Sequence, residues 1–190
     1  MRSLILGMLI TFAIASCQSE GDRGTVDAAA VPSPKPSDCR TIQHAMGETE
    51  ICGQPQRIVA LGPYVLEPLL ALEIEPVGYG DHIAFHLEDY SNPSQQIPYL
   101  GDRITQPIAN VGTAYTPSME AIVKTQPDLI LATEGNISQY ETLSAIAPTL
   151  ALDYADIEGS FRAIAKAVNR SQKADRLLAE TERNIAAARE

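Results

Sequence analysis

The apolar residues of this chain follow two alternating patterns from residue 57 onward. Short continuous apolar runs, of which DLILA at 128–132 is the clearest, are typical of strands buried on both faces. Apolar residues three or four positions apart lie between these runs and indicate helices, one of which contains Pro68, expected near its start. This alternation predicts an α/β fold, in which a parallel, Rossmann-like sheet is covered by helices on both faces. We expect strands at 57–61, 76–78, 109–111, 128–132 and 149–152, and helices at 64–72, 117–126, 136–146, 160–169 and 171–190.

The helix that precedes DLILA has a clear predicted start and a clear predicted buried face. Thr116 is the expected cap of this helix, with Pro117 at its first position, where a missing N–H is tolerated. Met119, Ile122 and Val123 then recur at helical spacing, so we expect these three side chains to be buried against the sheet.

The final helix carries no stop signal. Its apolar positions continue from Ser171 to Glu190 without a glycine cap or a proline, whereas helices usually end on such a signal. We therefore expect that the sequence is truncated, or is a fragment of a longer protein.

The first 16 residues have the pattern of a secretory signal peptide. One arginine precedes an apolar run that is too short to span a bilayer comfortably, and small residues follow. The sequence IASC at 14–17 resembles the bacterial lipobox, which implies cleavage before Cys17, a palmitate-type lipid on Cys17, and export to the membrane surface, facing the periplasm or the cell exterior. The alternatives are an uncut membrane anchor or a chance cysteine. Residues 17–38 are polar and proline-rich, as a flexible tether would be.

Two further cysteines, Cys39 and Cys52, lie at the start of the expected fold. An exported chain meets oxidising conditions, so an even pair predicts a disulfide, with two free thiols as the alternative. Ile42 and Ile51 flank a turn in which Gly47 can adopt a positive φ, so a β-hairpin with a glycine bulge would bring the cysteines together. We expect a structural role in either case, because no acid–base partner lies nearby.

Charge and motifs exclude several classes of protein. The chain has a formal net charge of −10, from 14 basic and 24 acidic residues, which argues against a nucleic-acid partner. No Ser/His/Asp or Cys/His arrangement is visible, so we predict that the chain is not an enzyme. The stretch GYGDHI lacks the third glycine of a dinucleotide loop, and no phosphate-binding G-x-x-x-x-G-K-[ST] loop is present.

His82 and His86 are the strongest candidates for a metal site. They lie four residues apart, a spacing that on a helix could direct two imidazoles at one zinc or manganese ion. The segment has poor helical periodicity and no stable third ligand, so two polar loop histidines are the alternative that we favour.

Several stretches together resemble one family. They are the lipobox, PQRIVALGPYVLEPLLALEIEPVGYG, IANVGTAYTPSMEAIVKTQPDLILAT and YETLSAIAPTLALD. They look like the N-terminal lobe of iron–siderophore-binding lipoproteins of bacterial ABC importers, a fold shared with vitamin B12- and haem-binding members. The resemblance implies a lobe at 39–170 and the start of a long inter-lobe helix at 171–190, with the second lobe missing. It also implies a monomer with no intrinsic cofactor, a ferric siderophore as the transported ligand, and a permease as partner.

The candidate ligand-binding residues follow the predicted strands. In open α/β sheets, ligands lie outside the carboxyl ends of the strands, where this chain carries Tyr64, His82, Tyr115 and Glu134. Several hydroxamate- and citrate-binding relatives carry an arginine in the segment held here by residues 113–115, which has no positive charge. Arg103 in the long loop is a possible substitute, so the charge of the chelate stays open.

Glu120, in the first turn of the helix at 117–126, has two interpretations. As a surface acid, it can interact favourably with the positive end of the helix dipole and can pair with Lys124. The resemblance instead implies that it docks into arginines of the permease. The alternatives for the whole chain are a binding protein for haem, vitamin B12 or zinc/manganese, and, from another class, a single-lobe surface interaction module or a non-functional fragment.

Overall fold

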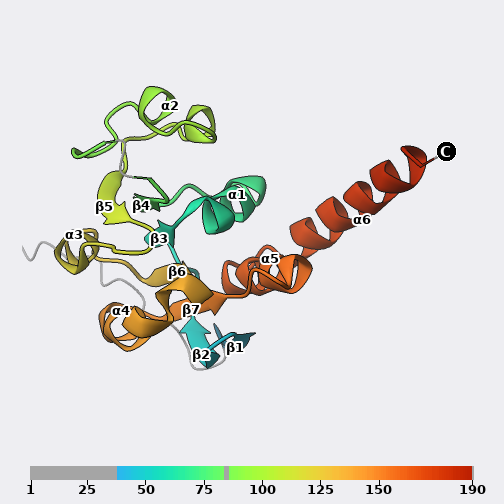
Figure 1. The fold of residues 1–190 in the computed structure, drawn as a ribbon. Helices are drawn as coiled ribbons and strands as arrows, with labels where there is room; N and C mark the ends of the chain where they lie inside the picture. Colours follow the sequence, from blue (N-terminus) through green and yellow to red (C-terminus); the bar gives the residue numbers. More distant parts are fainter. Residues whose placement is uncertain (1–37, 84–85, 190) are drawn as a thin grey trace, which may run out of the picture. The chain divides into compact units, whose positions relative to one another are not determined.

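Five parallel strands form the central sheet of this chain (Figure 1). The computed structural model describes residues 38–83 and 86–189, which belong to one unit, Pro34–Glu190. The strand order is β5-β4-β3-β6-β7, which confirms the predicted fold class. The strands are β3 (Ile58–Leu61), β4 (Gly78–Asp81), β5 (Ala109–Thr113), β6 (Leu129–Thr133) and β7 (Thr149–Leu152).

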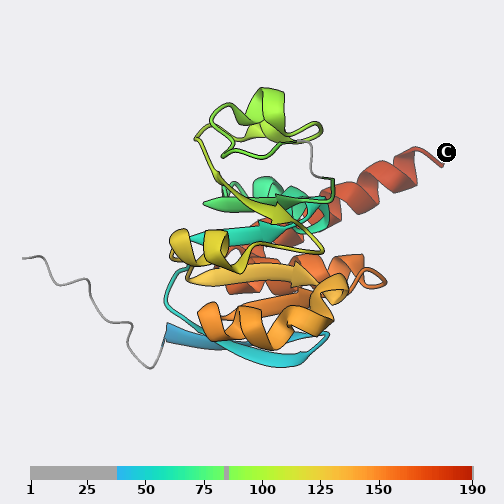
Figure 2. The ribbon, with the colours of Figure 1, turned by 60° about the vertical axis from the view of Figure 1, so that its left-hand side comes forward.

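Helices cover both faces of the sheet (Figure 2). One face carries α1 (Pro63–Ala71), α5 (Ile157–Ala167) and the start of α6 (Ser171–Ala187), and the other carries α3 (Met119–Lys124) and α4 (Tyr140–Ile146). Alternate residues of each strand point to alternate faces. In β3, for example, Ile58 and Ala60 join the core under α1 and α5, whereas Val59 and Leu61 join the core under α3. The short helices α2 (Pro93–Gln96), η2 (Gly101–Arg103) and η3 (Glu134–Gln139) complete the described elements.

The predicted signal segment and the predicted lipidation site lie outside the described residues, as does the predicted tether up to residue 37. Within the described ranges, no helix combines the length and apolar character that crossing a bilayer requires.

A β-hairpin of β1 (Cys39–His44) and β2 (Gly47–Cys52) packs beside β7, the last strand of the sheet. Ala45 N–H donates to Ala151 O over 2.9 Å, and the Thr49 hydroxyl donates to the carbonyl of the first residue of β7 over 3.0 Å. The hairpin thereby covers backbone groups that an open edge would expose. Gly47 has the expected positive φ of 114°. The expected bulge is absent, because His44 pairs directly with Gly47 across a two-residue turn.

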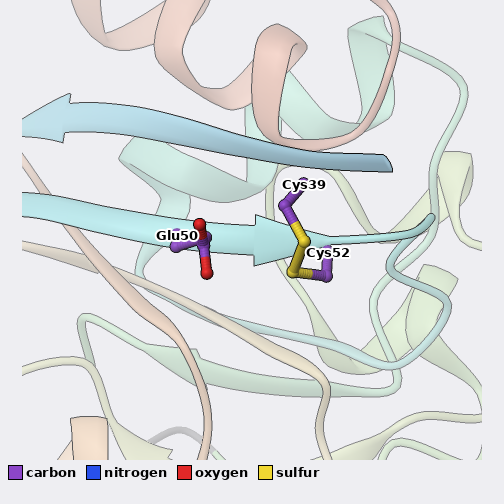
Figure 3. Close-up of side chains that lie close together, drawn as sticks. All are labelled: Cys39, Glu50 and Cys52. Atoms are coloured by element: carbon purple, nitrogen blue, oxygen red, sulfur yellow. A yellow bond between two sulfur atoms is a disulfide. The ribbon is translucent and has the colours of Figure 1, made fainter. Parts of the chain in front are cut away.

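The Sγ atoms of Cys39 and Cys52 are joined in a disulfide that closes the open end of the hairpin (Figure 3). Arg40, next to Cys39, donates to the carbonyls of Gly53, Lys166 and Ala167. These contacts satisfy carbonyls at the end of α5, where a positive charge is also favoured by the helix dipole. The disulfide end of the hairpin is therefore fastened to the carboxyl end of α5.

The second strand lies further along the chain than predicted. β4 spans Gly78–Asp81 rather than 76–78, so Gly80 and Asp81 belong to the strand and not to the loop after it. The glycines of this strand permit close packing: a Cβ on Gly78 would lie 3.0 Å from a methyl group of Val111. Tyr79, between the glycines, is 1% exposed and provides the apolar contact of this strand.

The predicted start of α3 is wrong by two residues. The cap is Ser118, whose Oγ accepts a hydrogen bond from Ala121 N–H over 3.2 Å. Pro117 instead forms an isolated antiparallel bridge with Gly112, so the chain is still extended at this point. The buried face of the helix also differs from the prediction. Ile122 is completely buried and Met119 partly so, but Val123 is 53% exposed.

Two other helices differ from expectation. Pro68 is the sixth of the nine residues of α1 rather than part of its first turn, because Pro63 already occupies the helix start after Gly62, which has a φ of 104°. The segment expected as one helix at 136–146 begins as 3₁₀ helix η3 and becomes α4 at Tyr140. Burial of the Asn136 side chain in η3 turns Ile137 outward, and Ile137 is 49% exposed.

Candidate functional site

The strand order places a crevice between β3 and β6. From β3 the chain builds β4 and β5 on one side, and it then returns to place β6 and β7 on the other. Ligands of open α/β sheets bind outside the carboxyl ends of the strands at such a reversal. The residues that follow these two strands are Gly62 to Tyr64 and Glu134 to Asn136. The topology therefore selects the loops after β3 and β6 as the centre of a candidate site.

Two tyrosines pack against each other at this edge. The Tyr64 hydroxyl donates to Asp153 O over 2.8 Å, and the ring centroids of Tyr64 and Tyr154 lie 4.6 Å apart in an edge-on arrangement. The Tyr154 hydroxyl donates to Thr133 Oγ1 over 2.9 Å. Aromatic pairs of this geometry are stabilised beyond their burial. The loops after β3, β6 and β7 are thus held together by aromatic contact and hydrogen bonds.

A third tyrosine lies over the loop after β6. A Cβ on Gly135 would approach the Tyr115 ring to 2.9 Å, so the ring lies directly against this loop. Asn136 Nδ2 donates to Ala114 O over 2.7 Å, and Gln139 Nε2 donates to Tyr115 O over 3.0 Å. The side chain of Tyr115 remains 51% exposed. It therefore presents an aromatic face and a hydroxyl to solvent from a firmly placed backbone.

The comparisons with known proteins identify the family of this chain. Residues 58–190 match the family model described as periplasmic binding protein. This chain belongs to that family. It is a family of substrate-binding proteins rather than enzymes.

Two curated relatives come from Bacillus subtilis. The Fe(3+)-citrate-binding protein YfmC is 32% identical, with 97% of this chain and 55% of the relative covered. The protein named "Probable siderophore-binding lipoprotein YfiY" is 28% identical, covering 96% and 53%. A solved structure, Staphylococcus aureus SirA complexed with staphyloferrin B, is similar with a TM-score of 0.66 at 31% identity, covering 78% of this chain and 48% of SirA. The chain thus spans about half the length of the relatives that it matches.

Burial and nearby carboxylates raise the pKa values of two tyrosines at this edge. Burial raises the pKa of Tyr64, and the charges of Asp153, Asp156 and Glu134 raise it further. Burial also raises the pKa of Tyr154, with a contribution from Glu134. Both phenols therefore stay protonated at neutral pH, as hydrogen-bond donors need to be.

The carboxylate of Glu134 differs from its acidic neighbours. Asp153 Oδ1 accepts from Ala155 N–H, and Asp156 Oδ1 accepts from Gly159 N–H at the start of α5. Glu134 is exposed, and within the described residues its side chain has no hydrogen bond and no ion pair. The Glu134 carboxylate is therefore available for an electrostatic interaction with a ligand that contacts the tyrosines.

His82 lies directly after β4, at the same edge as the tyrosines. Its Nδ1 lies 2.7 Å from Asp81 Oδ1, and Asp81 is only 4% exposed. The His82 ring also faces Tyr99, with the centroids 6.4 Å apart. Because the Asp81 carboxylate orients Nδ1, the outer Nε2 is the ring atom left for a ligand.

Arg103 is not connected to this group by any contact in the described chain. It is exposed in η2, and within residues 38–83 and 86–189 its side chain forms no hydrogen bond or ion pair. Two residues further on, Thr105 N–H and Oγ1 donate to Glu75, which precedes β4. The chain after Arg103 is thus fastened near the beginning of β4 rather than its carboxyl end.

The two histidines considered for a metal site have separate partners. His86 stacks on Tyr90 with the centroids 5.6 Å apart, and its Nε2 contacts Gln96 Nε2 at 2.7 Å. In the described part of the chain, the only group of three potential ligands is Cys39, Glu50 and Cys52 (Figure 3). Both of its sulfurs are consumed by the disulfide, so this group offers no thiolate to a metal.

Glu120 lies on the exposed side of α3, away from these tyrosine contacts. Its carboxylate is 2.8 Å from Lys124 Nζ, and the hydrogen bond and charge of that lysine lower the pKa of Glu120. Both side chains are largely exposed, so the pair itself adds little stability.

Tyr154 was missed by sequence reasoning. It follows the predicted strand at 149–152 by two residues, so the rule that selected Tyr64 and Tyr115 applies to it equally. The structure makes Tyr154 the link between them. Its ring contacts Tyr64, and its hydroxyl lies near that of Tyr115.

Proposed function

We propose that this chain is the ligand-capturing lobe of the substrate-binding component of an ABC importer, which binds a ferric siderophore and delivers it to a membrane permease. The observation that carries the proposal is the group of tyrosines at the β3/β6 crevice in a chain of the periplasmic binding protein family. Relatives named for ferric citrate and siderophores, and a similar structure complexed with staphyloferrin B, support the choice of ligand.

The residues at the crevice suit a large, rigid chelate. Tyr115 and Tyr154 offer exposed ring surface on which the organic shell of the chelate can pack. The Tyr115 hydroxyl and Nε2 of His82 can form directed hydrogen bonds to the chelate, and the Tyr154 hydroxyl, which donates to Thr133, can accept one. The iron belongs to the ligand, and the lobe is proposed to contact only the chelating molecule.

The rest of the chain has a proposed place in the same scheme. Cys17 would carry the lipid, residues 17–38 would be the tether, residues 39–170 the first lobe, and residues 171–190 the beginning of the helix that leads to a second lobe. The relatives, about twice as long as this chain, support that arrangement. Glu120, exposed on α3, is the proposed contact to the permease.

Chelate binding can be measured through intrinsic fluorescence, to which this lobe contributes tyrosines but no tryptophan. The full-length protein of this reading frame, without lipid, is titrated with ferric hydroxamate, catecholate and citrate chelates, and with haem and cobalamin. We expect saturable quenching by at least one ferric chelate. Quenching only by haem or cobalamin would move the assignment to those ligands, and no quenching by any of them would refute it.

The site itself is tested by a matched pair of variants. Tyr115→Phe removes an exposed hydroxyl at the crevice and should raise the Kd about 2- to 10-fold, the value of one lost hydrogen bond. Tyr140→Phe makes the same chemical change beside the hairpin, where the hydroxyl is 3.4 Å from His44 Nε2, and should leave the Kd unchanged. Equal effects of the two variants would place the chelate elsewhere.

A further inference from the structure

The loops at the carboxyl edge of the sheet carry an excess of negative charge. The segments 62–64, 82–83, 114–116, 134–136 and 153–156 contain Glu134, Asp153 and Asp156 but no lysine and no arginine. Asp81, the last residue of β4, is also acidic, and it is buried against His82. The edge that would face the ligand is therefore acidic in this lobe, although one of the similar proteins is named for ferric citrate.

Arg162 and Lys124 are already paired with acids, and the Arg103 side chain makes no contact with this edge in the described chain. Arg162, at the next turn of α5, forms ion pairs with Glu158 and Asp175. Lys124 pairs with Glu120 on the outer side of α3. Arg103 lies in η2, and the chain that follows it is bound to Glu75 near the start of β4.

Glu134 is the acid placed to act on a ligand. Its neighbour Gly135 lies against the Tyr115 ring, and Thr133 on its other side accepts a hydrogen bond from the Tyr154 hydroxyl. The glutamate thus lies in the loop between two residues that contact tyrosines of the crevice, and its exposed side chain has no partner in the described chain. Its charge contributes to the raised pKa values of both Tyr64 and Tyr154, so it does act on groups at this site.

We propose that this lobe selects ferric chelates without net negative charge, and that Glu134 sets this preference by repelling an anionic chelate from the tyrosines and attracting a cationic one. This inference rests on the proposed function and goes beyond it, because it names the charge class of the ligand. An unpaired carboxylate beside a bound anion would repel it, whereas a ligand ammonium group would gain an ion pair.

A pair of ligands that differ in one charge isolates the effect. Ferrioxamine B carries a pendant ammonium group, and its N-acetylated form has the same iron cage without that charge. The full-length protein should bind ferrioxamine B about threefold more tightly than the acetylated form, as expected for one partly exposed ion pair. The difference should shrink as salt is added. Ferric citrate and ferric enterobactin, both anionic, should bind more weakly than either.

Variants assign the preference to one residue. Glu134→Gln should make the two ferrioxamines equal, and Glu134→Lys should favour the anionic chelates. Glu50→Gln is the matched control, because Glu50 is an exposed glutamate near the disulfide, at the opposite end of the hairpin from its turn (Figure 3). It should leave every affinity unchanged.

Three results would overturn the inference. The first is that the parent protein binds an anionic chelate more tightly than the ferrioxamines, or binds only an anionic chelate. The second is that the parent binds the two ferrioxamines equally. The third is that Glu134→Gln still prefers ferrioxamine B to its acetylated form. In each of these cases the protein still binds a chelate, so the proposed function stands. Failure to bind any ferric chelate would instead refute the proposed function, and this inference with it.

Discussion

Two buried tyrosines near Asp81 are expected to make the stability of this lobe depend on pH. Tyr79 and Tyr90 are 1% and 2% exposed, and their ring centroids are 6.0 Å apart. Burial, with the nearby Asp81 charge, raises the pKa of Tyr79 far above its usual value and that of Tyr90 to about 12. Ionising either phenol inside the core is therefore unfavourable.

The stability of the lobe should fall as pH rises between about 10 and 12. In that range the unfolded chain loses the Tyr90 proton while the folded chain keeps it, because the folded pKa is raised to about 12. The free energy of unfolding should drop by up to about 1 kcal/mol per pH unit from this residue. Urea unfolding across this range measures the slope. Tyr90→Phe should make the slope shallower but not abolish it, because Tyr79 acts in the same direction. Identical slopes for parent and variant would contradict the prediction.

At the scale of elements, the hairpin is held to the sheet by two kinds of bond. Its turn end is hydrogen-bonded to β7 through Ala45 and Thr49. Its open end is closed by the Cys39–Cys52 disulfide and fastened to the last carbonyls of α5 by Arg40. Ile42 and Ile51 bury the inner face between these two ends. The hairpin is thus an integral part of the lobe and the cover of its β7 edge.

Reducing the disulfide should destabilise the lobe without unfolding it. The bond closes a loop with a sequence separation of 13, for which the chain-entropy model gives about 2–3 kcal/mol. Urea midpoints of the mature protein, measured with and without dithiothreitol, test this, and thiol titration confirms that reduction is complete. A variant with both Cys39→Ser and Cys52→Ser should match the reduced parent and ignore the reductant. An unchanged midpoint after full reduction would show that the hairpin needs no covalent closure.

At the scale of the whole molecule, the two surfaces proposed to make contacts lie on different parts of the described chain. The tyrosines occupy the carboxyl edge of the sheet, whereas Glu120 lies on the outer side of α3. From residue 180 to residue 189 every residue of the last helical stretch is exposed. This chain spans about half of its relatives, so uptake is a property to be measured on the full-length protein.

Replacing Glu120 by alanine should abolish uptake and leave chelate affinity intact, if this acid contacts the permease. Radiolabelled iron uptake by cells, with fluorescence titration of the purified protein, measures the two properties. Lys124→Ala removes only the ion-pair partner and should preserve uptake. Glu141→Ala is the matched control, because Glu141 is also an exposed acid in the first turn of a helix on the same face. Normal uptake by Glu120→Ala would leave Glu120 as a surface acid paired with Lys124.

The sequence by itself determined the elements whose signals are local. DLILA predicted a doubly buried strand, the apolar run at 149–152 matched β7 at both ends, and Gly47 predicted a positive φ. These predictions succeeded because burial on two faces and a tight turn leave their mark on adjacent residues. Tyr64, Tyr115 and Glu134 were selected by the same kind of rule, as residues that follow strands.

Only the tertiary structure decided which of those residues meet. The position of β6 beside β3 creates the crevice, and no local pattern encodes strand order. β4 runs three residues beyond the predicted 76–78, because the close packing of Gly78 and Gly80 against neighbouring strands cannot be read from adjacent residues. Val123 was expected to be buried and is exposed, because only the packing of α3 on the sheet decides which side of the helix is covered. Tyr154 joined the site, and Glu134 was left without a partner, through contacts between loops far apart in the chain. Sequence patterns record what neighbours along the chain need, whereas a binding site depends on residues that the fold brings together.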